Sequence, residues 1–208
     1  MGSLERLPYL RACVDADDTF MYDVFCTTWE SEVAALPNPK LAQHVLRIQH
    51  IAQERRFHTR YPNHERYVVE EQGEPAGRLY VDRNETMMHV VDLTLLPKFQ
   101  SQGIGTRIFQ DLFDVAGEDR QVVTLRVPRR NVRATDLYTS LGFRLVSMDD
   151  LDSYFEWTPA TIAAPEDMKE GVSAVEEGPS AMKEGPSAMK EDPSAMKEDH
   201  VGVRADGR

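Results

Sequence analysis

The 208-residue sequence contains only two cysteines, Cys13 and Cys26. A domain of roughly 150 residues buries enough surface to fold without a disulfide or a structural metal. Two cysteines therefore indicate free thiols in a reducing compartment rather than a disulfide framework. The histidines and cysteines also lack zinc-ligand spacing, so we expect no metal site.

The sequence also lacks a long apolar run. No window approaches the roughly 18 consecutive apolar residues that a membrane-spanning helix needs. Residues 1–18 alternate short apolar pairs with charges, unlike a secretory signal peptide. These absences predict a cytoplasmic protein without a membrane partner.

Positive charge is scarce, with 24 Lys and Arg against 35 Asp and Glu and a net charge of −11. Affinity for a phosphate backbone comes mainly from Lys and Arg, so the balance argues against nucleic acid as a partner. One local exception is the cluster of Arg126, Arg129, Arg130 and Arg133. A basic patch on an acidic protein favours a small anionic ligand.

Large apolar residues almost vanish after residue 158, where a seven-residue repeat takes over. The repeats Glu-Gly-Pro-Ser-Ala-Met-Lys at 177–183 and 184–190, and a variant at 191–197, each contain a proline. An interior proline costs a helix about 3 kcal/mol, which excludes a coiled coil. We predict a folded domain at 1–158 and a disordered acidic tail at 159–208 that serves as a solubilising appendage.

Apolar periodicity predicts a mixed order of helices and strands in 1–158. The longest helix, residues 39–60, has Leu41, Val45, Ile48 and Ala52 along one face. The expected strands are 7–14, 67–71, 77–83, 87–96, 122–127, 143–148 and 153–157. One further helix is expected after residue 18. Two more are expected at 103–116, which Gly117 ends, and at 131–141, which Asn131 caps. The order β-α-α-β-β-β-α-β-α-β-β predicts an α+β (mixed α/β) fold around a mixed sheet.

The turn Gln100-Ser-Gln-Gly103-Ile-Gly105 lies between a predicted strand and a predicted helix. The first amides of a helix lack intrahelical partners and carry partial positive charge, so they suit a phosphate. Glycines at 103 and 105 let the backbone approach such an anion closely. Ile108 replaces the third glycine of a dinucleotide fingerprint, and Gly105-Thr106-Arg107 does not end a P-loop.

Two segments carry a resemblance to a known family. Leu95-Leu-Pro-Lys-Phe-Gln100-Ser-Gln-Gly103-Ile-Gly105 resembles the pyrophosphate-binding segment of the GNAT superfamily, with its Gln/Arg-x-x-Gly-x-Gly/Ala core. The stretch with Asn131, Ala134, Tyr138 and Gly142-Phe143 resembles the family's Asn-x-x-Ala-x-x-x-Tyr-x-x-x-Gly-Phe. The resemblance covers about residues 7–158 and implies a twisted, mostly antiparallel sheet of six to seven strands with about four helices.

The resemblance implies an N-acetyltransferase that moves an acetyl group from acetyl-CoA to an amine by direct attack in a ternary complex. The acceptor would be an amine of a small molecule or of a protein, and relatives often form homodimers. The implied cofactor-binding residues lie in both motifs: Leu95, Gln100, Gln102, Gly103, Ile104, Gly105, Thr106, Asn131 and Arg133. A non-catalytic acyl-CoA-binding sensor on the same fold is the alternative.

Two residues are the candidates for catalysis. Tyr138 falls on the family's tyrosine position, and a phenol can protonate a departing thiolate. Asp92 is the candidate base or anchor for the acceptor amine, because simple strand alternation places it with Val90 and Thr94, opposite Val91. His89 and Glu30 are weaker alternatives for the base.

Overall fold

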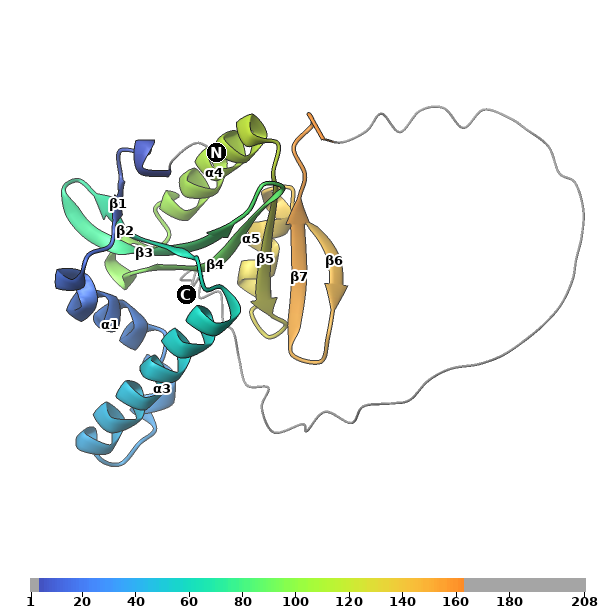
Figure 1. The fold of residues 1–208 in the computed structure, drawn as a ribbon. Coiled ribbons are helices and arrows are strands. Elements are labelled where there is room, and N and C mark those ends of the chain that lie inside the picture. Colours follow the sequence, from blue (N-terminus) through green and yellow to red (C-terminus); the bar gives the residue numbers. More distant parts are fainter. Residues whose placement is uncertain (1–3, 163–208) are drawn as a thin grey trace, which may run out of the picture.

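The computed structural model describes residues 4–162, which form a seven-stranded sheet with helices on both faces (Figure 1). The strands are β1 (Leu10–Ala12), β2 (Glu65–Glu71), β3 (Glu74–Arg83), β4 (Met87–Leu95), β5 (Val122–Pro128), β6 (Arg144–Met148) and β7 (Asp152–Trp157). Their order is β1-β2-β3-β4-β5-β7-β6, and only β4 and β5 pair in parallel in this sheet. The predicted mixed, mostly antiparallel sheet is confirmed, whereas the repeats of the predicted tail lie outside the described residues.

Within residues 4–162 there are five α-helices, one more than expected. They are α1 (Asp18–Thr27), α2 (Glu30–Ala34), α3 (Pro39–Arg60), α4 (Ile104–Asp119) and α5 (Val132–Ser140). Asn38 starts α3, because its side chain accepts a hydrogen bond from the Lys40 amide at 2.9 Å and Pro39 follows. Helix α4 continues past the predicted stop at Gly117 to Asp119. The next residue, Arg120, caps the helix in a left-handed conformation with φ of 53°.

The sheet separates two hydrophobic cores. Ile108 of α4 and Tyr138 of α5 pack on one face, while Met21 of α1 and Phe57 of α3 pack on the other. The apolar side predicted for α3 is not the side that is buried: Leu41 and Ile48 are 45% and 51% exposed. The buried residues of this helix are Gln53 and Phe57.

A β-bulge interrupts β4 next to the predicted catalytic position. Tyr80 pairs with Asp92 and Val81 with Val90, which leaves Val91 as the additional residue. Val90 therefore packs in the core under α4, whereas Val91 packs in the core under α1 and α3. The expectation that Asp92 shares a face with Val90 and opposes Val91 was wrong, because the bulge breaks the alternation.

Candidate functional site

The turn between β4 and α4 presents open backbone amides. Gly103 precedes the helix in a left-handed conformation with φ of 76°, and no side chain of the described residues caps the helix start. The first amide that bonds back into the helix is that of Arg107, which donates to the Gly103 carbonyl at 3.0 Å. The preceding amides are thus available to an anion, as expected for a helix N-terminus.

The glycines of this turn fit a closely bound ligand. A Cβ placed on Gly103 or Gly105 would meet no atom within 4 Å. Gly103 requires glycine for its positive φ, but neither backbone conformation nor internal packing requires it at Gly105. Gly105 leaves the backbone open at this point, which would allow an anion such as a phosphate to approach closely.

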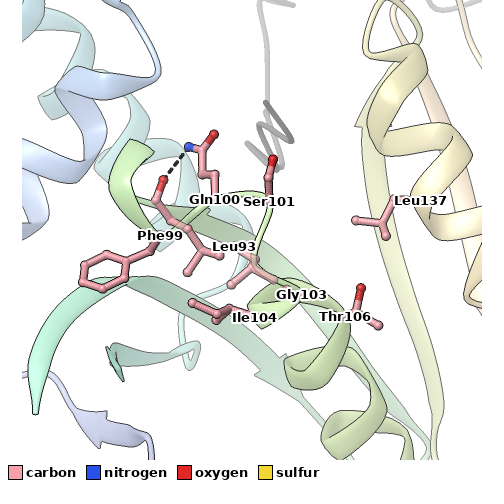
Figure 2. A pocket seen from close by; sticks show the side chains of 10 residues that line it. Leu93, Phe99, Gln100, Ser101, Gly103, Ile104, Thr106 and Leu137 are labelled. Atoms are coloured by element: carbon pink, nitrogen blue, oxygen red, sulfur yellow. Dashed lines mark hydrogen bonds between the residues drawn. The ribbon is translucent and has the colours of Figure 1, made fainter. Parts of the chain in front are cut away.

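A pocket of about 130 Å³ lies between β4, this turn and α5 (Figure 2). Its wall combines apolar side chains with the turn: Leu93, Leu95, Phe99, Gln100, Ser101, Gly103, Ile104, Gly105, Thr106 and Leu137. The Gln100 amide donates from Nε2 to the Leu95 carbonyl at 2.7 Å, and its Oε1 is buried without a partner among the described residues. Six of the predicted cofactor-binding residues therefore line one pocket. Gln102 does not line it, and its Nε2 donates to the Lys98 carbonyl instead.

Strands β4 and β5 part next to this pocket. Their pairing ends at Val90 and Leu125, although β4 runs on to Leu95 and β5 to Pro128. The five residues of β4 beyond the last pair span roughly 16 Å. One backbone edge of this segment is left without a strand neighbour and can bind an extended ligand arm.

Tyr138 projects from α5 into the core beside this site. It is fully buried, with Phe109, Phe143 and Phe155 around its ring, and its hydroxyl has no hydrogen-bond partner in the described residues. Burial, and secondly the negative charge of Asp92, raise the pKa of this phenol. The hydroxyl therefore stays protonated and can act as a proton donor.

Asp92 lies on the opposite face of the sheet, where it forms a buried ion pair. Its Oδ2 accepts from Arg78 Nε at 2.6 Å, and the two side chains are 1% and 0% exposed. Arg78 also donates to Gln53 Oε1 of α3 at 3.0 Å and to the Met21 carbonyl of α1 at 3.5 Å. The sequence reasoning missed Arg78, although a charged residue next to the apolar run Leu79-Tyr80-Val81 was a usable signal.

The second motif lies at the start of α5. Asn131 is confirmed as the helix cap, since its Oδ1 accepts from the Ala134 amide at 3.1 Å. Arg133 donates to Ser101 Oγ at 3.1 Å, which places it beside the turn between β4 and α4. Arg126 of the same cluster instead pairs with Asp152 at 2.6 Å, away from the turn.

The two weaker candidates for the base lie elsewhere. His89 is hydrogen-bonded through both ring nitrogens, to Tyr61 Oη at 2.9 Å and to Thr124 Oγ1 at 2.8 Å. Glu30 is exposed at the start of α2. Neither side chain lines the pocket beside the turn.

Residues 4–162 lack two kinds of structural feature. None of their helices combines the length and apolar character needed to cross a membrane. They also contain no group of three or more His, Cys, Asp and Glu side chains arranged to hold a metal ion.

Comparisons with known proteins agree with this geometry. Residues 21–143 match the acetyltransferase (GNAT) family. The fold is similar to PaiA N-acetyltransferase from Thermoplasma acidophilum in complex with coenzyme A, with 15% identity, a TM-score of 0.54 and coverage of 72% of this chain and 97% of that chain. It is also similar to RimL, a ribosomal L7/L12 alpha-N-protein acetyltransferase in complex with coenzyme A, with 18% identity, a TM-score of 0.51 and coverage of 72% and 93%.

A third similar structure is the dodecameric spermidine N-acetyltransferase from Vibrio cholerae, with 15% identity, a TM-score of 0.50 and coverage of 76% and 97%. No curated protein matches the sequence. At these identities the solved structures support the fold, while the family match spans more than half of the chain. The chain therefore belongs to the acetyltransferase (GNAT) family.

Proposed function

We propose that this protein is an N-acetyltransferase that transfers the acetyl group of acetyl-CoA to an amine by direct attack. The observation that supports it best is that the amides before Arg107 and the part of β4 beyond its last pair with β5 border the same pocket. The first suits a diphosphate and the second an extended pantetheine arm. Coenzyme A is bound in the similar PaiA and RimL structures, which supports the same ligand here.

The residues of the turn bind the donor in this proposal. The backbone amides of Gln102 to Thr106 hold the diphosphate, and the β4 backbone at Leu95 holds the arm. The buried Oε1 of Gln100 accepts a hydrogen bond from an amide of the arm. Arg133, already beside the turn, and Asn131 contact the 3′-phosphate side of the ligand.

Acetyl-CoA supplies the thioester acyl group. The neutral amine of the acceptor attacks the carbonyl carbon, the carbon–sulfur bond breaks, and the amine nitrogen loses a proton to solvent or base. Tyr138 gives its phenolic proton to the departing sulfur and is reprotonated from solvent. Its burial keeps the phenol protonated before the reaction.

For Asp92 we propose a role on the acceptor side of the sheet. Full protonation of this carboxylate would leave the Arg78 guanidinium buried without its counter-charge. This favours the second of its two predicted roles, an electrostatic anchor for the acceptor amine, over a base that keeps the proton.

The acceptor in this proposal is an amine of a small molecule or of a protein. RimL acts on a protein amino terminus and the Vibrio cholerae enzyme on spermidine, so the fold accommodates both classes. That enzyme is dodecameric, and for this chain we propose self-association as a homodimer, which analytical ultracentrifugation tests.

The proposed activity is tested by thiol release. The full chain is mixed with acetyl-CoA and a panel containing spermidine, lysine and a peptide with a free amino terminus, and free thiol is recorded. We expect release with at least one amine, and none with the Gly103→Glu variant. Thermal stabilisation by acetyl-CoA without release under saturating amines would instead indicate the non-catalytic binding module.

A further inference from the structure

The outer side of α3 carries an apolar stripe that the described residues leave exposed. Leu41, Ile48 and Ile51 are 45%, 51% and 52% exposed. At about 100° per residue they fall on one side of the helix, opposite the buried Gln53 and Phe57. Figure 1 shows one end of α3 extending away from the sheet, and the exposed fractions of these three side chains show that this side is open to solvent. Exposed apolar side chains gathered on one helix face mark an interaction surface.

The same side is basic. Lys40, Arg47 and Arg55 are exposed beside the apolar stripe. The only carboxylate of α3, Glu54, lies on the inner side, where its Oε1 accepts from Tyr80 Oη at 3.3 Å. In a protein of net charge −11, this outer face of α3 therefore has no acidic residue of its own. Its chemistry suits an acidic segment with apolar side chains.

A second copy of the chain is a poor occupant for this face. Two identical faces would bring Lys40, Arg47 and Arg55 of one copy close to the same residues of the other. Like charges that face each other across an interface are unfavourable. The occupant should carry the opposite charge.

We propose that a part of residues 163–208 of the same chain docks on the outer face of α3. This segment contains eleven carboxylates against six Lys and Arg, and the four methionines 168, 182, 189 and 196. Its repeats place each methionine within two or three residues of a glutamate. Methionine is flexible and fits irregular apolar surfaces, so these repeats combine both features that the face requires.

Because residues 163–208 belong to the same chain as α3, weak contacts are sufficient for docking. A linker of about 20 residues spans on average roughly 25 Å, which compares with the size of such a domain. Attachment by a linker of this kind gives an effective concentration in the millimolar range. A segment that binds with millimolar affinity is then docked for a large part of the time. This inference does not rest on the proposed acetyltransferase function.

The test measures how fast hydrogen peroxide oxidises the methionines of the full chain. Peroxide converts an accessible methionine to its sulfoxide, and mass spectrometry of peptides assigns the site. We compare the wild-type chain with the double variant Ile48→Gln, Ile51→Gln. We expect at least one of Met182, Met189 and Met196 to react about threefold more slowly in the wild type. About 0.5 M salt should remove part of this protection, because it screens the charge attraction.

Two controls make the result specific. Val132→Gln removes a 63% exposed apolar side chain on α5 and should leave every rate unchanged. Met148, 54% exposed on β6, should react equally in all variants. Equal tail rates in the wild type and the α3 variant would overturn the proposal. Protection that increases with protein concentration would also overturn it and would indicate a second copy.

Discussion

Arg78 Nε donates to Asp92 Oδ2 at 2.6 Å, and both side chains are almost completely excluded from solvent. The pair joins neighbouring strands, and through Gln53 and the Met21 carbonyl the guanidinium also holds α3 and α1 against the sheet. Asp92 directly follows the bulge residue Val91 and lies two residues beyond Val90, the last residue of β4 that pairs with β5. One ion pair thus connects β3 and β4 with the helices α1 and α3 that cover them.

Breaking this pair should destabilise the protein strongly. Asp92→Asn leaves the buried guanidinium with only the more distant carboxylate of Glu54, at 3.9 Å, and removing the close partner of a buried pair costs about 3–5 kcal/mol. Urea unfolding measures the loss. The control Glu74→Gln removes an equally short but exposed pair, to Lys98, and should cause no measurable change. The double variant Arg78→Met, Asp92→Leu should lose less free energy of unfolding than the sum of the losses of the two single variants. Strict additivity of these losses would contradict an energetic coupling between the two residues.

Gly103→Glu should abolish coenzyme A binding, because a carboxylate would lie against the phosphate-binding amides. The matched control is Gly73→Glu, since Gly73 also has a positive φ and open space at its Cβ. Backbone strain should lower the free energy of unfolding of both variants by a similar amount, roughly 1–2 kcal/mol. Calorimetric titration with coenzyme A should then separate them, and wild-type affinity in Gly103→Glu would contradict the assigned turn.

Tyr138→Phe should lower turnover while leaving the affinity for coenzyme A within about twofold. The hydroxyl is buried without a partner among the described residues, so its removal should not destabilise the fold. Thermal unfolding and the thiol-release assay measure the two effects separately. Unchanged turnover in a stable variant would remove the proposed role as acid.

Alkaline pH should weaken the fold through its buried tyrosines. Burial raises the pKa of Tyr80 to about 12, and it raises the pKa of Tyr138 as well. Below pH of about 10 both phenols are protonated in the folded and unfolded chain, so they change nothing there. Between pH of about 10 and 12 only the unfolded chain loses these protons, and the free energy of unfolding falls by about 1.4 kcal/mol per pH unit for each phenol.

Urea unfolding at several pH values above 10 gives the slope of this loss. Tyr138→Phe should show a shallower slope than the wild type, because the variant lacks one of the titrating phenols. An identical slope would show that Tyr138 does not stay protonated in the folded chain.

Asn131→Ala should cost about 1 kcal/mol of stability, because the Ala134 amide loses its cap. Asn131→Ser should keep most of that stability, since a serine hydroxyl can cap the same helix. Titration of Asn131→Ser with coenzyme A then isolates the proposed ligand contact. An affinity equal to that of the wild type would leave Asn131 with the cap alone.

The local signals of the sequence predicted much of the site. The Gly103 turn, the Asn131 cap and the strand before Gln100 are determined by neighbouring residues, because positive φ, helix capping and alternation act within a few positions of the chain. The helix at 39–60 was also predicted with its observed bounds. The sequential order of strands and helices followed from the apolar periodicity, and the mostly antiparallel sheet followed from the resemblance to the family.

Long-range pairing decided the rest. The bulge at Val91 depends on how β3 lies against β4, so strand alternation alone placed Asp92 on the wrong face. The buried partner of Asp92 was hidden in another strand, and which arginine lies beside the turn depended on where α5 packs. The apolar stripe of α3 was visible in the sequence, but only the packing of Phe57 and Gln53 against the sheet showed that the stripe faces outward.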